Sequence, residues 1–114
     1  MTPDGADLEA AARLFRALAT PSRLRLLCLL GEGQATVSQL VERSGLSQPL
    51  VSQHLRILRE TGLVTLTRSG REAVHALADT HVGHIVADAV AHAAEPRSAS
   101  GEVRGAAPEQ RSSA

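Results

Sequence analysis

Residues 36–61 read TVSQLVERSGLSQPLVSQHLRILRET, and this stretch decides the fold. Thr36 followed by Gln39 is a capping-box pattern, which predicts a short helix that ends at Gly45. Ser47 can cap a second helix that continues to the end of the stretch. The connection between Gly45 and Ser47 is short enough to hold the two helices at a steep angle. The stretch therefore predicts a helix-turn-helix unit.

The flanking sequence extends this unit on both sides. Caps and periodic leucines predict two preceding helices, and beyond Gly62 the apolar period changes from that of a helix to that of strands. A last helix is predicted near the C-terminus, and it cannot continue through Pro96. The expected elements are helices from Asp7 to about Ala19 and from Pro21 to the stop at Gly31 and Gly33, strands at 63–67 and 72–77 with a turn around Ser69-Gly70, and a helix from Asp79 to about Glu95. This order predicts a mainly α fold with a small β-hairpin, a winged helix-turn-helix.

Length and composition fit one small aliphatic domain. The chain has 114 residues, of which 43% are hydrophobic, and Phe15 is its single aromatic residue. We expect a flexible N-terminus at 1–6, a folded domain at 7–95 and a disordered tail at 96–114, since the tail has almost no large apolar side chains. No apolar run approaches the ~20 residues that a membrane span needs, and no secretory signal is evident. The lone Cys28 excludes an intrachain disulfide framework, fits a reducing cytoplasm, and is expected to be a small buried hydrophobe.

The net charge of zero is the sum of unlike parts. Residues 1–12 carry −3, residues 13–71 carry +6 from nine arginines and three glutamates, and residues 72–114 carry −3. A basic middle between acidic ends suggests contact with a polyanion, while the alternative is an Arg-rich helical face that is simply solvated.

The second helix of the central unit presents an outward polar face of Gln48, Ser52, Gln53 and Arg56. Glutamine can read adenine edges in the major groove, and serine can contact bases or phosphates. Four arginines, two on this helix and two beside the hairpin turn, are placed to hold phosphates: Arg56, Arg59, Arg68 and Arg71. Together with Ser47, these residues predict a site for double-stranded DNA; the alternative is an ordinary polar helix face. His54 is expected to pack inside rather than to read a base.

The run from Leu18 to Val64 contains ATPSRLRLL and SQPLVSQHLRILRETGLV, and it resembles the ArsR/SmtB family of bacterial metal-responsive repressors. The match continues through SGREAVHAL and the last helix, so that it covers about residues 8–95. From GREAV onward the chain looks especially like the mycobacterial SmtB-type zinc sensors. The resemblance implies a homodimer formed through the first and last helices, without enzymatic activity. It also implies that the metal-free dimer binds a palindromic operator and that metal releases it.

The expected last helix carries three histidines and two carboxylates on one stripe, namely His81, His84, Asp88, His92 and Glu95. Neutral imidazole and carboxylate together suit Zn, Co or Ni without a thiolate. The helix rises about 16 Å from His81 to His92, so one ion cannot reach both ends of a single helix. Two copies packed antiparallel would place Asp79 and His81 of one chain opposite the partner's His92 and Glu95, which makes two identical sites.

The resembled family shows a fixed pattern on this helix: Asp-x-His, ten residues, His, two residues, then His or Glu. Four residues match it at every position: Asp79, His81, His92 and Glu95. Two nitrogens and two oxygens suit tetrahedral zinc. His84 would then lie near the partner's Asp88 and form a His–carboxylate pair with it, or it would serve as a further ligand. The family's thiolate site is absent, because its Cys-x-Cys positions correspond to Thr36 and Ser38.

Three alternatives remain open. A nickel or cobalt sensor of the same family would recruit His84 or the N-terminus to reach six ligands. A metal-independent DNA-binding protein would keep the helix-turn-helix and make no use of the stripe. A metal-dependent hydrolase is disfavoured, because the candidate groups lie on one helix at a dimer seam and the chain has no pocket-forming insertions. His75, on an expected strand, is assigned a structural role.

Overall fold

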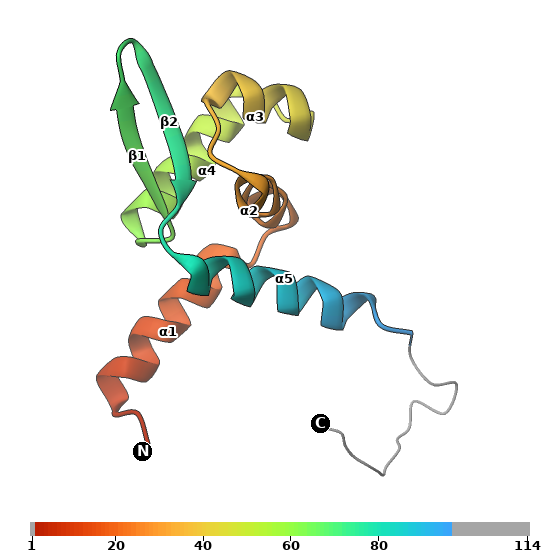
Figure 1. Ribbon diagram of the computed structural model, residues 1–114. Coiled ribbons are helices and arrows are strands. Elements are labelled where there is room, and N and C mark those ends of the chain that lie inside the picture. Colours follow the sequence, from red (N-terminus) through yellow and green to blue (C-terminus); the bar gives the residue numbers. More distant parts are fainter. Residues whose placement is uncertain (1, 97–114) are drawn as a thin grey trace.

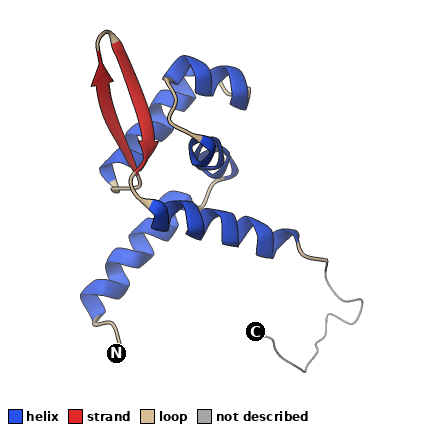
Figure 2. Cartoon of the chain, viewed as in Figure 1, coloured by secondary structure: helices blue, strands red, loops and turns tan. Residues whose placement is uncertain are grey.

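The computed structural model describes residues 2–96, so the expected disordered tail lies, apart from Pro96, outside the described residues. Within this part the chain forms five helices and one two-stranded antiparallel sheet (Figures 1 and 2), which confirms a mainly α fold with a small hairpin. The elements in chain order are α1 (Gly5–Leu18), α2 (Pro21–Glu32), α3 (Val37–Ser44), α4 (Gln48–Glu60), β1 (Val64–Ser69), β2 (Glu72–Leu77) and α5 (Thr80–Ala94).

The first helix begins earlier than the sequence analysis placed it. Asp4 is the N-cap, and its side chain accepts a hydrogen bond from the backbone N–H of Asp7 at 2.9 Å. Asp7 lies at the third helical position and returns the contact to the backbone N–H of Asp4 at 3.4 Å. The prediction that Asp7 caps the helix was therefore wrong, because the two acids three residues apart form a reciprocal capping box. Residues 5 and 6, which we assigned to a flexible N-terminus, belong to α1.

The two helices of the central unit form as their caps predict. Thr36 caps α3 by accepting the backbone N–H of Gln39 at 3.2 Å, and the side chain of Gln39 accepts the backbone N–H of Thr36 at 2.9 Å. Gly45 ends α3 in the left-handed region with a φ of 75°, which glycine adopts without steric cost. Ser47 then caps α4 through the backbone N–H of Leu50 at 3.4 Å. The turn between the helices is thus fixed by local side-chain chemistry.

The hairpin is joined to the helical body at its middle. β1 and β2 pair antiparallel with Leu66 opposite His75, and the first strand is shifted slightly from the predicted 63–67. The shift arises because the backbone N–H of Leu63 bonds to the carbonyl of Leu58 and so belongs to the exit from α4. His75 also exchanges two backbone hydrogen bonds with Ala35, of 2.8 and 2.9 Å, just before α3. The hairpin is therefore held against the helix-turn-helix rather than standing free.

The core is aliphatic, as the composition requires, and is centred on α2, α3 and α4. Its largest fully buried side chains are Leu26, Leu27, Leu40, Val51, Leu55 and Leu58. The outer helices contribute less, since only Ala17 and Leu18 of α1 and Val82 and Val86 of α5 are buried. Figure 1 shows α1 and α5 leading away from this core in different directions. Among the described residues, no helix is long and apolar enough to cross a membrane.

Candidate nucleic-acid interface and metal centre

The polar face predicted on α4 is exposed to solvent. Gln48, Ser52 and Gln53 are all exposed, while the opposite side of α4 is buried in the core. Ser47 is exposed as well, but its hydroxyl already accepts the capping hydrogen bond. The three side chains on α4 are therefore free to reach a base edge, and Ser47 fixes where the helix begins.

Arg56 occupies the same face but already has a partner. Its Nε lies 3.3 Å from Oε2 of Glu60, one helical turn further on, and both side chains are largely exposed. An exposed pair of this kind contributes about 0.3–0.5 kcal/mol, so a phosphate can replace the glutamate at small cost. Arg56 therefore remains available for a phosphate contact.

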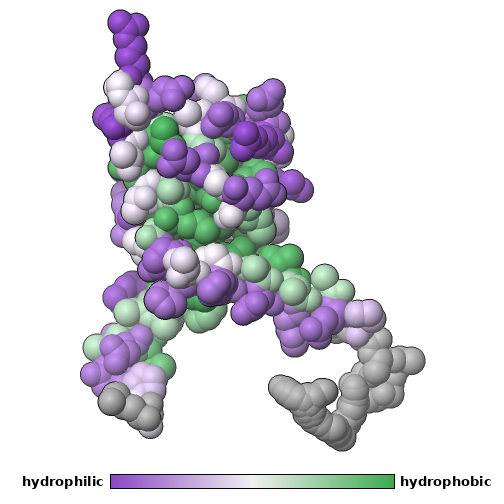
Figure 3. Space-filling view, viewed as in Figure 1, coloured by the Kyte–Doolittle hydropathy of each residue, from purple (hydrophilic) through white to green (hydrophobic). Residues whose placement is uncertain are grey.

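Two further arginines lie on the hairpin. Arg68 is part of β1, Arg71 lies in the turn that connects the strands, and both are exposed. The turn is made possible by Gly70, whose φ of 62° lies in the left-handed region. Figure 3 shows a hydrophilic tip on the hairpin, beyond the body of the molecule. The hairpin thus presents positive charge at a distance from α4, as a phosphate contact beside the groove requires.

Arg59 differs from Arg56, Arg68 and Arg71 because its guanidinium contacts a histidine. Its Nη1 lies 3.0 Å from Nε2 of His75 on β2, so part of its guanidinium is directed at the hairpin. Sequence reasoning placed Arg59 on phosphate and gave His75 only a structural role, without linking the two. Their separation of 16 residues carries no periodic signal, so the contact could be found only from the packing of the hairpin beside α4.

The other buried imidazole lies on α4 itself. His54 is 9% exposed, which confirms that it packs inside, and its Nδ1 accepts a hydrogen bond from Nε of Arg23 at 3.3 Å. The same arginine donates to the carbonyl of Ala17 at 2.9 Å. Burial, and secondarily the charge of Arg23, lower the pKa of His54. Neutral His54 thus helps to join α4 to the end of α1.

The four residues predicted to bind metal lie in two pairs at opposite ends of α5. At the start, Nδ1 of His81 is 3.7 Å from Oδ1 of Asp79; at the end, Nδ1 of His92 is 3.9 Å from Oε1 of Glu95. All four side chains are more than half exposed. Each pair brings one imidazole nitrogen and one carboxylate oxygen together. Each pair therefore presents half of a tetrahedral donor set of a kind that suits zinc.

No complete site forms within the described part of one chain. Among these residues, no group of three or more His, Cys, Asp or Glu side chains is placed to hold an ion. This agrees with the helix rise of about 16 Å between the two pairs. The donors fit a divalent metal in chemistry, and within the described residues each pair supplies two donors of the four that a tetrahedral site takes.

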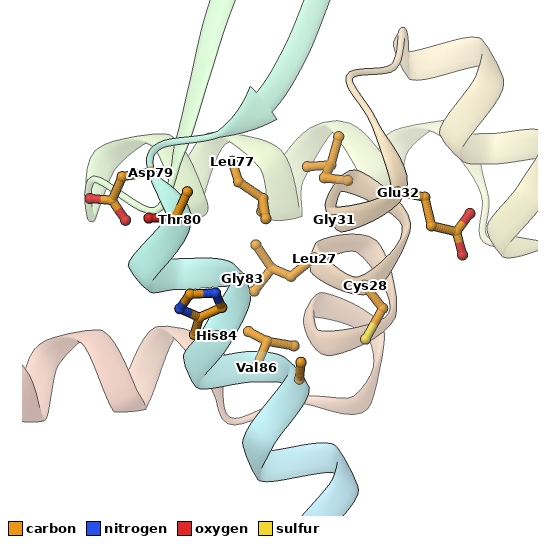
Figure 4. Close-up of a pocket in the computed structure, with 12 residues that line it drawn as sticks. Leu27, Cys28, Gly31, Glu32, Leu77, Asp79, Thr80, Gly83, His84 and Val86 are labelled. Carbon is orange, nitrogen blue, oxygen red and sulfur yellow. The ribbon is translucent and has the colours of Figure 1, made fainter.

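A groove between α2 and α5 is bordered by the remaining candidate groups. Figure 4 shows Leu27, Leu77 and Val86 along its apolar floor, with Cys28 on α2 and His84 on α5. The prediction that Cys28 is buried was wrong, because α2 directs its neighbouring leucines into the core and leaves the thiol exposed. His84 is exposed too, and the described chain offers it no carboxylate partner.

The two outer helices leave apolar side chains uncovered. Leu8 and Phe15 of α1 are 58% and 60% exposed, and Ile85 and Val90 of α5 are 39% and 43% exposed. Figure 3 shows apolar surface across the middle of the molecule, next to α5. Exposed apolar patches of this kind are typical of interaction surfaces.

Comparison with known proteins shows the family of the chain. The model of the "Bacterial regulatory protein, arsR family" matches residues 20–65, the segment from α2 to the start of β1. The regulator NmtR from Mycobacterium tuberculosis is 45% identical over 89 residues, which are 75% of this chain and 74% of NmtR. This chain belongs to the arsR family. The repressor SmtB from M. tuberculosis is 54% identical over 88 residues. That match covers 77% of this chain, which spans 65% of the length of SmtB.

Solved structures share the fold, among them one of a possible ArsR-family regulator. A homodimeric winged helix-turn-helix DNA-binding domain from Mycobacterium bovis superimposes with a TM-score of 0.71 at 29% identity, covering 82% of this chain and 90% of that domain. HlyU from Vibrio cholerae gives a TM-score of 0.73 at 29% identity, covering 81% of this chain and all of HlyU. These likenesses confirm the winged helix-turn-helix. The relatives named here are regulators or repressors by name, and the family model is that of a regulatory protein.

Proposed function

We propose that this protein is a zinc-responsive transcriptional repressor, which binds a palindromic operator as a metal-free homodimer and leaves it when metal binds. The observation that carries the proposal is the division of four metal-binding side chains into two His–carboxylate pairs at opposite ends of α5. Neither pair suffices alone, and the two are too far apart to cooperate within one helix. They become complementary when a second copy is packed antiparallel.

DNA recognition in this proposal belongs to α4 and the hairpin. The exposed Gln48, Ser52 and Gln53 would read base edges, and Arg56, Arg68 and Arg71 would hold phosphates. A dimer presents two such faces, so its target is expected to contain two inverted half-sites one helical turn apart. The basic residues of this part supply the salt-dependent share of the affinity.

Dimer formation is supported by the uncovered apolar residues of α1 and α5. Phe15 and Leu8 expose most of their surface, which is unfavourable for a chain that stays monomeric. Packing α5 against its symmetry mate would cover Val90 and Ile85 and bring each Asp79–His81 pair toward the partner's His92–Glu95 pair. Zinc at such a site would be held by two nitrogens and two oxygens and would supply a rigid link between the two subunits.

The proposed effect of metal on DNA affinity follows from thermodynamic linkage between metal binding and DNA binding. If the metal-bound dimer prefers a spacing of the two α4 helices that does not fit the operator, metal and DNA oppose each other by one coupling free energy. The repressor and regulator names of the relatives support operator binding, and the donor set of α5 supports zinc as the effector.

The test is a metal titration of the protein–DNA complex. A fluorescent duplex that the metal-free protein selects from a random library serves as probe, and anisotropy reports release. We expect zinc to release the wild-type protein and to leave His92→Ala bound. His84→Ala is the matched control, because it also removes an exposed imidazole from α5 and should respond to zinc as the wild type does. A His92→Ala protein that releases at the wild-type zinc concentration would refute the site.

A nickel or cobalt sensor is the second candidate, and the exposure of His84 favours it. His84 lies between the two pairs and borders the same groove as Asp79, so it could raise the number of ligands toward six. Nickel and cobalt are therefore included in the titration, with X-ray absorption of the loaded protein. If six-coordinate nickel releases DNA more effectively than zinc, and His84→Ala loses that effect, the nickel assignment replaces zinc.

A further inference from the structure

The contact between Arg59 and His75 joins the helix proposed to read DNA to the hairpin beside it. Arg59 lies in the last turn of α4, and His75 lies in the middle of β2. Figure 1 shows the hairpin beside α4, and the two elements are in contact through β1 as well. A side-chain bond at this junction can fix how the two DNA-facing elements sit relative to each other.

The chemistry of the two groups sets the direction of the bond. A guanidinium can only donate, so Nε2 of His75, 3.0 Å from Nη1 of Arg59, must be the acceptor. This requires a neutral ring with its proton on Nδ1. Burial, and then the charge of Arg59, lower the pKa of His75 and keep the ring neutral. Its neighbours Ala35 and Leu66 carry no charge that would reverse this.

The imidazole is costly for the fold at this position. His75 is 3% exposed, and its Nδ1 has no hydrogen-bond partner among the described residues. A buried N–H without a partner is unfavourable, and its neighbours across the sheet and in the bridge are the apolar Leu66 and Ala35. An aliphatic side chain would avoid that penalty. The fold alone therefore gives no reason for a histidine here, whereas the bond to Arg59 does.

We propose that His75 is a positioning residue for DNA binding, which holds the Arg59 guanidinium in a fixed orientation so that its remaining N–H groups meet a phosphate at the junction of α4 and the hairpin. This inference rests on the proposed operator binding. Arg59 is exposed, and only one of its nitrogens is used by His75, so the other donors are available. A side chain that is already ordered loses less entropy when it binds.

The test compares four variants of the full chain, kept metal-free with a chelator, on the duplex selected by the wild type and on a random duplex of equal length. Arg59→Ala is expected to weaken both complexes about tenfold and to lower the salt slope by about one. His75→Leu is expected to melt at the same or a higher temperature, yet to bind about three- to tenfold more weakly. His75→Gln should restore most of the affinity, because its amide oxygen can accept from Arg59. In the Arg59→Ala background, His75→Leu should have no further effect.

His54→Gln is the matched control, since it alters the other buried imidazole that accepts from an arginine. It is expected to lower the melting temperature and to leave DNA affinity nearly unchanged. A folded His75→Leu variant with wild-type DNA affinity would overturn this inference. An equal loss of DNA affinity from His75→Leu in the wild-type and in the Arg59→Ala background would overturn it too. Neither result would contradict the proposed operator binding. A wild-type chain that enriches no duplex would overturn operator binding together with this inference.

Discussion

One carboxylate oxygen of Asp79 faces both the backbone of α5 and the imidazole of His81. Oδ1 of Asp79 accepts the backbone N–H of Val82 at 3.1 Å and lies 3.7 Å from Nδ1 of His81. The cap of the helix is thus also a proposed metal ligand. Because the hydrogen bond to the backbone holds the carboxylate in place, this oxygen of the proposed donor set is already oriented in the metal-free chain.

This double role can be separated by two substitutions at one position. Asp79→Asn keeps a good N-cap but loses the carboxylate, whereas Asp79→Ala loses both. We expect both variants to bind zinc far more weakly, by more than the 10- to 100-fold that loss of an outer partner typically costs. Only Asp79→Ala should also lose about 1 kcal/mol of stability. Calorimetry with zinc and chemical denaturation of the metal-free protein measure the two effects. Wild-type zinc affinity in Asp79→Asn would remove Asp79 from the ligand set.

Base reading and phosphate binding should separate between α4 and the hairpin. Gln48→Ala is expected to cost about 1–3 kcal/mol on the selected duplex and much less on random DNA, because only the former offers the matching base edge. Arg71→Ala should weaken both complexes and lower the salt slope by about one, since a phosphate contact carries no sequence information. Binding titrations at several salt concentrations distinguish the two. Equal losses on both duplexes for Gln48→Ala would exclude it as a base reader.

The stability of the metal-free protein should fall as the pH is lowered through the range of histidine titration. Burial lowers the pKa of both His54 and His75 below the ordinary value of 6.5. Below pH 6.5 the unfolded chain therefore binds more protons than the folded one, and acid favours unfolding. Denaturation midpoints between pH 7.5 and 5 should decrease, and they should decrease less in His54→Gln. A midpoint that rises toward acid pH would contradict the assignment of these rings as neutral in the folded state.

Local signals predicted most of the fold. The caps at Thr36 and Ser47 and the left-handed stop at Gly45 appear where the sequence places them, because each depends on residues within three or four positions. The start of α1 was missed because two acids three residues apart can both serve as the cap. The exposure of Cys28 was missed because periodicity shows which residues share a helix face but not which of several apolar neighbours meets the core.

The candidate sites were predictable only in part. Helical spacing was enough to group His92 with Glu95, whereas Asp79 was added beside His81 by the resemblance to the family. The structure brings each pair to within 4 Å. The bond between Arg59 and His75 was not predictable, because it depends on how the hairpin packs beside α4 and not on any periodic pattern. A contact between two residues on different elements of one chain leaves no periodic pattern in the sequence.

The intersubunit nature of the proposed sites can be tested by complementation. In an antiparallel dimer, each site takes Asp79 and His81 from one chain and His92 and Glu95 from the other. A mixed dimer of one His81→Ala chain and one His92→Ala chain would then place both changes in the same site and leave the second site with all four donors. We expect this mixed dimer to bind one zinc ion with wild-type affinity, whereas each homodimeric variant binds none tightly. Differently tagged chains, purified in tandem and titrated with zinc, provide the measurement. Two equally weakened sites in the mixed dimer would show instead that each chain binds its own ion, and the antiparallel arrangement of α5 would have to be abandoned.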